Sequence, residues 1–119
     1  MTQDSEDYKT PPEGVAFVED LVERFDDLRT IFQEHVADND EILPHLFMGD
    51  VTRYVLSGGS QRQELVRHLN DALRTGEEYI ENLIAVSFVE NLESEEELER
   101  ALRDAQADAL REEWRRQRL

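Results

Sequence analysis

The chain has 119 residues, a length that suits one domain whose core needs no disulfide or metal to hold it together. It carries 29 acidic and 13 basic residues, a formal net charge of −16. Such a surface repels nucleic-acid phosphates and anionic membranes, so we expect neither as a partner. Cysteine is absent, which excludes disulfide bonds and thiolate metal sites.

The N-terminal residues 1–12 are polar and include two prolines, a pattern typical of a flexible arm. We therefore expect an arm over residues 1–12 and a single helical domain over residues 13–119. The N-terminus lacks the basic and apolar regions of a secretory signal, and no apolar run approaches the roughly 20 residues that span a bilayer. These observations favour a cytoplasmic protein.

Two helices are predicted in the first half of the chain. Residues 13–36 place apolar side chains three and four positions apart, and the segment ends at the polar residues 38–40. A second helix is predicted over residues 44–56, because Pro44 suits a first helical turn and Ser57-Gly58-Gly59 follows as a stop.

Two further helices follow. The third is predicted from Ser60, which forms a capping-box pattern with Gln63, to Gly76 as a left-handed cap. The fourth, residues 77–92, is apolar on nearly every side, which indicates a central buried helix. A strand competes there, because residues 84–89 are rich in branched and aromatic side chains. The length and the helical flanks favour a helix.

The fifth predicted helix runs from Ser94, which forms a second capping box with Glu97, to about residue 118. Its apolar stripe is narrow and consists of small residues. Leu110 and Trp114 lie beside that stripe, either on the core or in an exposed patch for association. Together these segments predict an all-α fold, a compact five-helix bundle-like domain with residues 77–92 at its centre.

Acidic residues are concentrated at the front of the chain. Residues 1–50 hold 14 acidic and 3 basic residues, a net charge of −11. The pattern fits either a solvated helix face or a docking surface that captures a basic protein by electrostatic steering. The candidate partner-binding residues are Glu19, Asp20, Glu23, Asp26, Asp27, Asp38 and Asp40.

Three charged residues fall on apolar helix faces, Arg29, Asp50 and Glu90, and Arg53 is a candidate ion-pair partner for the two acids. A charge inside a protein must be paired or neutralised. One interpretation pairs an arginine with an acid inside the bundle. The other places these side chains in a groove between helices, where they would meet a ligand or partner.

No motif points to catalysis. The three histidines (His35, His45 and His68) lie on different predicted helices without metal-binding spacing, although a site built from His45, Asp50 and a glutamate is conceivable in a bundle. Ser87 has no histidine at helical spacing to activate it. We expect no catalytic residues, no metal and no cofactor.

Two stretches carry a resemblance: residues 42–52 read ILPHLFMGDVT, and residues 82–92 read NLIAVSFVENL. They resemble a family of small bacterial helical domains of unknown function, which look like some immunity proteins of polymorphic toxin systems. The resemblance implies a compact helical domain and a protein-binding role. It carries over no catalytic residue.

The leading hypothesis is a non-enzymatic protein-interaction module, in its most concrete form an immunity-type antitoxin that masks a basic effector. An alternative of another class is a structural homo-oligomer joined through the fifth helix and Trp114. A third is a metal-binding or enzymatic bundle that uses His45, Asp50 and Glu90.

Overall fold

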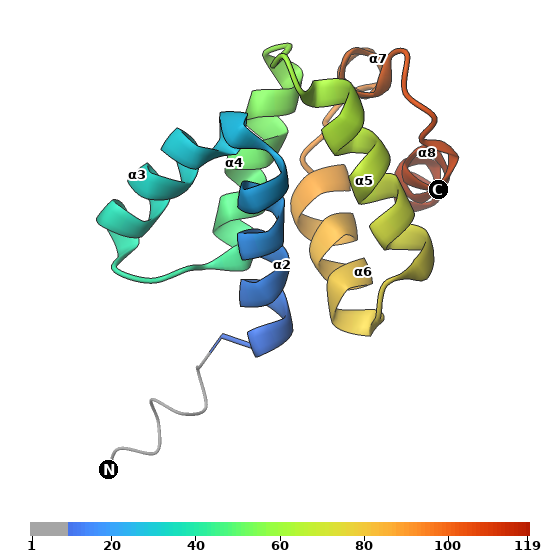
Figure 1. Cartoon of the computed structure of the whole chain (residues 1–119). Helices are drawn as coiled ribbons and strands as arrows, with labels where there is room; N and C mark the ends of the chain where they lie inside the picture. The colour runs from blue at the N-terminus through green and yellow to red at the C-terminus, as the bar shows by residue number, and fades with distance from the viewer. Residues whose placement is uncertain (1–9) are drawn as a thin grey trace.

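The computed structural model describes residues 10–119, and all the regular secondary structure in that range is helical. Seven α-helices and two short turns of other helix types follow one another (Figure 1). They are α2 (Pro12–Arg24), η1 (Asp26–Leu28), α3 (Arg29–Asn39), α4 (Pro44–Leu56), α5 (Arg62–Thr75), α6 (Glu78–Ile84), η2 (Ala85–Val89), α7 (Glu95–Leu102) and α8 (Asp108–Gln117).

The all-α prediction is confirmed, but the number of helices was wrong, because two of the five predicted helices break. The first breaks at Phe25, whose φ of −124° and ψ of 98° are extended, so that η1 and α3 leave in a new direction from α2. The last breaks between α7 and α8, where Asp104 adopts a left-handed φ of 63°. Residues 1–9 of the expected N-terminal arm lie outside the described range.

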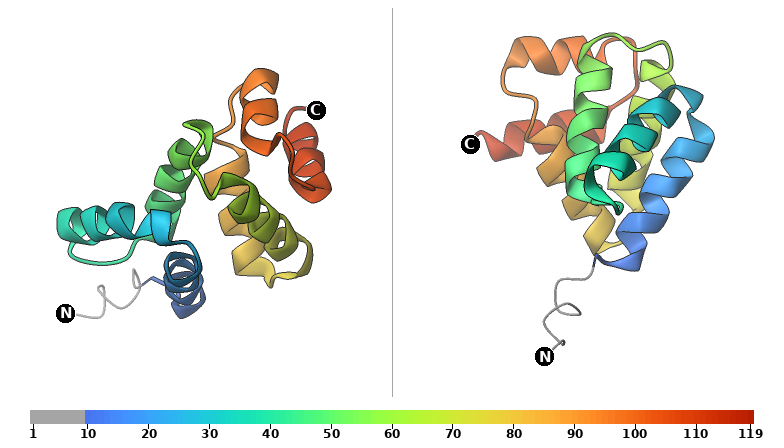
Figure 2. Two further views of the ribbon diagram at one scale, coloured as in Figure 1. Left: turned by 45° about the horizontal axis from the view of Figure 1, so that its top comes forward. Right: turned by 90° about the vertical axis from the view of Figure 1, so that its left-hand side faces the viewer.

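The segment formed by α6 and η2 lies at the centre, as the sequence predicted, and packs against α2, α4, α5 and α8 (Figures 1 and 2). Its Leu83, Ile84, Phe88 and Val89 are fully buried. Its outer side is solvated, however, and Val86 is 42% exposed. The last turn widens into a π-helical turn, in which the N–H of Glu90 donates to the carbonyl of Ala85 at 3.1 Å.

Capping differs from the sequence prediction at two places. The predicted box at Ser60 and Gln63 does not form, because α5 begins two residues later and the Ser60 hydroxyl donates to Asp27 instead. Gly76 ends α5 in an extended rather than a left-handed conformation, with φ −76° and ψ 163°. The predicted cap at Ser94 is confirmed, since its hydroxyl accepts from the N–H of Glu97 at 3.1 Å.

Side chains from other helices satisfy the backbone groups that the helix breaks leave free. The Arg62 guanidinium of α5 donates to the carbonyls of Ala101 and Arg103, both at 2.9 Å, where α7 ends. The buried Asn70 of α5 accepts from the N–H of Leu110 at 3.0 Å, in the first turn of α8. These bonds hold the α7–α8 break against α5, which explains why two short helices replace one long one.

Trp114 also faces inward. Its indole Nε1 donates to the carbonyl of Leu92 at 2.7 Å, the Arg118 guanidinium lies 4.2 Å from the ring centre, and Leu110 is fully buried. Of the two interpretations left open by the sequence, the structure places Leu110 and Trp114 on the core. The indole ring therefore makes its contacts within the chain.

Replacing Asn70 by leucine should lower the free energy of unfolding by about 1–2 kcal/mol, the usual cost of losing a helix cap and leaving a buried N–H without an acceptor. Chemical denaturation measures this. Asn70→Asp is the matched control, since it keeps an oxygen at the same position and should cost clearly less. Equal losses in the two variants would show that the bond to Leu110 does not stabilise α8.

Candidate functional site

The acidic residues predicted on the first helix do not form one uniform face. Glu19 and Glu23 on α2 are exposed, and neither has an ion pair among the described residues. Asp20 pairs with Arg24 at 2.7 Å, and its carboxylate lies 3.9 Å from Nε2 of His68. Together with Glu13, which is also exposed and without an ion pair among the described residues, these glutamates supply the unpaired negative charge of α2.

The next two predicted residues, Asp26 and Asp27, have structural partners. Asp26 accepts from Arg29 at 3.0 Å. Asp27 accepts from the hydroxyls of Tyr54, at 2.5 Å, and Ser60, at 2.6 Å, while its own N–H donates to Gln61 at 2.9 Å. Asp27 thus joins the break after α2 to the turn between α4 and α5.

The Tyr54 ring reaches this position because Gly59 has no side chain. A Cβ on Gly59 would lie 2.1 Å from the ring, closer than any two carbon atoms can approach without a bond. The Tyr54 hydroxyl also accepts from the N–H of Gln61 at 2.8 Å. Asp27, Tyr54, Ser60 and Gln61 form one network, which we call the Asp27 network.

Asp38 and Asp40 lie at the end of α3 and are exposed. Asp40 closes the helix with a left-handed φ of 62°, and its N–H donates to the carbonyl of Val36 at 2.7 Å. The predicted end of the helical segment near residues 38–40 is confirmed. Neither carboxylate has an ion pair within residues 10–119.

The interpretation that placed buried ion pairs inside the bundle was wrong. Arg29 and Glu90 are exposed. Arg53 does pair with Asp50, but on the surface, where the two side chains are 72% and 28% exposed. The prediction assumed that other helices cover the whole apolar side of each helix. In the structure, α3 leaves part of this side of α4 exposed to solvent.

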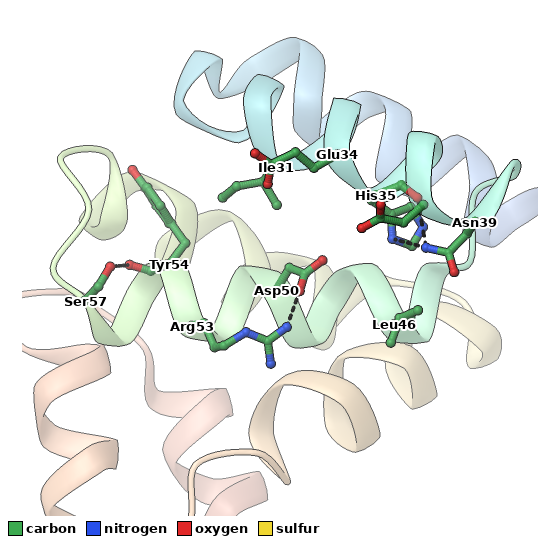
Figure 3. Close-up of a pocket in the computed structure, with 10 residues that line it drawn as sticks. Ile31, Glu34, His35, Asn39, Leu46, Asp50, Arg53, Tyr54 and Ser57 are labelled. Atoms are coloured by element: carbon green, nitrogen blue, oxygen red, sulfur yellow. Dashed lines mark hydrogen bonds and ion pairs between the residues drawn. The ribbon is translucent and has the colours of Figure 1, made fainter.

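The alternative interpretation, a groove, fits Asp50 and Arg53. A cavity of about 590 Å³ lies between α3 and α4, and Figure 3 shows side chains that converge on it from both helices. Three carboxylates and one guanidinium line it, together with apolar and neutral polar groups. Its lining residues are Ile31, Glu34, His35, Asp38, Asn39, Leu46, Asp50, Arg53, Tyr54 and Ser57.

The groove exists because α3 stands away from the rest of the fold. The helix packs mainly against η1, α2 and α4 (Figures 1 and 2). His35 is its one buried residue. His35 anchors the loop that leads to α4, since its Nε2 accepts from the N–H of Leu43 at 2.9 Å. Its ring also meets Phe47 edge-on, 5.5 Å between centres.

The remaining histidines have structural surroundings as well. Nδ1 of His45 is hydrogen-bonded to the hydroxyl of the nearly buried Ser87, a pair that helical spacing could not reveal because the residues are 42 positions apart. His68 stacks on the ring of Phe17 and meets the ring of Phe25 edge-on, with ring centres 6.3 Å and 6.0 Å away. Within residues 10–119, no three potential ligands gather as a metal site would require.

Three pKa values in these surroundings are shifted in informative directions. Burial, followed by the hydrogen bond to Asp27, raises the pKa of Tyr54 to about 12. The pKa of Asp27 is lowered by the hydrogen bonds from Ser60 and Tyr54. Burial and the nearby Arg24 charge lower the pKa of His68, against the opposing effect of Asp20 and Asp71.

Replacing Asp27 by asparagine should lower the pKa of Tyr54 from about 12 part of the way toward the ordinary value of 10, since burial, the larger cause, persists. Ultraviolet titration against a Tyr54→Phe reference measures it. Asp26→Asn is the matched control, because Asp26 bonds Arg29, and should leave the pKa unchanged. An unshifted Tyr54 in Asp27→Asn would contradict the network.

Acidification should destabilise the fold through His68. In the folded protein the pKa of His68 lies below the ordinary value of 6.5. As the pH falls below about 6.5, the unfolded chain therefore takes up a proton at His68 more readily than the folded chain, and the free energy of unfolding decreases. His68→Phe keeps an aromatic ring and should show a shallower loss between pH 7.5 and 5.5 when denaturation midpoints are compared. Parallel curves for the two proteins would contradict this.

None of the helices described by the structure is both long and apolar enough to cross a membrane. Neither the curated proteins nor the solved structures give a significant match to this chain. A protein-family match covers residues 18–119, which include α3, α4, the groove between them and the central α6–η2 segment. The chain therefore belongs to the DUF7674 family, a domain of unknown function.

Proposed function

We propose that this protein is a non-enzymatic interaction module that binds a basic protein partner. The observation that carries the proposal is the distribution of negative charge. Glu19, Glu23, Glu34, Asp38 and Asp40 are exposed on α2, on α3 and just after it, and none forms an ion pair among the described residues.

Electrostatics favours a basic protein over other partners. A net charge of −16 repels nucleic acid, and it also opposes close approach of a second copy of the chain. The same field accelerates encounter with a positively charged surface, and complementary charges help to exclude wrong partners. An immunity-type protein that masks a basic effector is the most concrete form of this proposal, and the likeness of residues 42–52 and 82–92 to such domains supports it.

The chemistry of the polar pairs favours binding over catalysis. The hydroxyl of Ser87 is nearly buried, which keeps a substrate away from it. The backbone N–H groups around it are hydrogen-bonded within the helix, so they cannot stabilise the oxyanion that attack by a serine would form. The contact between His45 and Ser87 is better explained as satisfaction of a nearly buried hydroxyl.

Affinity purification from a lysate of the source organism, followed by mass spectrometry, tests the proposal. We expect one basic protein to remain bound above about 0.2 M salt, where exposed charges are well screened. Once purified, that partner should form a complex of defined stoichiometry whose association rate falls as salt rises.

A variant with Glu19, Glu23, Glu34 and Asp38 changed to their amides should associate at least about tenfold more slowly, because it removes four unpaired charges from the proposed docking surface. A variant with four other exposed acids amidated, none of them ion-paired among the described residues, is the matched control: Glu64, Glu90, Glu95 and Glu96. The proposal fails if only a spread of basic proteins is captured and all are lost by about 0.2 M salt. It fails equally if the two variants behave alike.

A further inference from the structure

The groove between α3 and α4 has two features that a solvated helix face does not need. Leu46 is 51% exposed at the groove, and Ile31 on the opposite wall is half-buried. Glu34 and Asp38 stand one turn apart on α3, exposed and without ion pairs among the described residues. Apolar surface and unpaired negative charge therefore share one concave site.

The negative charge of the groove favours an occupant that carries positive charge. Glu34, Asp38 and Asp50 line the groove with a single guanidinium, that of Arg53. This guanidinium is already paired with Asp50, as Figure 3 shows. Glu34 and Asp38 are left to interact with a cation from outside. A purely apolar occupant would leave these carboxylates partly desolvated without a partner, which costs free energy.

The shape of the groove selects a helix. Its α4 wall runs from Leu46 to Ser57, which at 1.5 Å per residue is about 16 Å, or three helical turns. Extended peptides gain affinity by pairing with an open sheet edge, and both walls here are helices. Helices dock in such grooves through side chains one turn apart, the same spacing that separates Glu34 from Asp38.

We infer that the α3–α4 groove binds an amphipathic helical segment of a partner protein, one that presents lysine or arginine one turn apart beside an apolar side chain. The basic groups pair with Glu34 and Asp38, and the apolar side chain covers Leu46 and Ile31. This inference rests on the proposed function and names its site. It also predicts which acids determine affinity, since the glutamates of α2 lie outside the groove.

A labelled 14-residue helical peptide of leucine and lysine, with a scrambled peptide of the same composition, is a suitable probe. Fluorescence anisotropy at 0.15 M salt measures affinity, and NMR shifts of the ¹⁵N-labelled protein locate the site. We expect saturable binding of the amphipathic peptide with shifts in α3 and α4, and about tenfold weaker binding of the scrambled peptide, which cannot present both groups on one face.

Matched variants separate the groove from general attraction. Glu34→Gln with Asp38→Asn should weaken binding about tenfold, whereas Glu19→Gln with Glu23→Gln removes the same charge at the same spacing on α2 and should change it less than about twofold. Leu46→Ser should weaken binding about fivefold. Val86→Ser, at the other exposed large hydrophobic residue of the described helical segments, should leave binding unchanged.

Absence of binding to the wild-type protein, or equal effects of the α2 and α3 pairs, would overturn the inference. Equal effects of these two pairs would leave the proposed function standing, because the acids of α2 and α3 together would still attract a basic partner. Conversely, a groove that binds the peptide while no basic protein survives the salt wash would refute the proposed function alone. Circular dichroism of each variant confirms that the changes, all on exposed side chains, leave the fold intact.

Discussion

The fold depends on side chains that satisfy helix ends belonging to other helices. Each break in a helix frees backbone N–H and carbonyl groups, and such groups are costly to bury without partners. Here Gln61 accepts the N–H of Asp27, Arg62 donates to the end of α7, and Asn70 accepts the N–H of Leu110. All three are on α5 or just before it, so α5 holds both breaks of the chain in place.

The same constraint creates the candidate site. Because the chain breaks at Phe25 and the Asp27 network holds that break against the α4–α5 turn, α3 leaves the bundle instead of continuing α2 across it. His35 then fixes the far end of α3 to the loop before α4. The helix is held near both ends and covered on one side, which leaves its Glu34–Asp38 side facing an open groove.

Patterns of neighbouring residues in the sequence predicted the features of the fold that depend on local interactions. They gave the all-helical class, the bounds of α4, the central position of the α6–η2 segment and the cap at Ser94. They could not give the breaks, because an unbroken apolar stripe fits both a long helix and two short ones. The bonds that decide between them join residues 34 to 41 positions apart, from Asp27 to Gln61 and from Arg62 to Arg103.

The groove, too, could be predicted only in part from the sequence. The sequence singled out Asp50 because it interrupts an apolar face and Arg53 as its possible partner, and both line the groove. Arg29 and Glu90 interrupt apolar faces in the same way but lie elsewhere. A charged residue on an apolar helix face thus indicates that neighbouring helices leave part of the protein's apolar surface exposed. It does not indicate which part. Leu46 is the complementary signal, an apolar side chain left 51% exposed because α3 does not reach it. Exposed leucine and unpaired carboxylates in one concavity complement an occupant that is both apolar and basic, which is why we propose a basic amphipathic helix of a partner there.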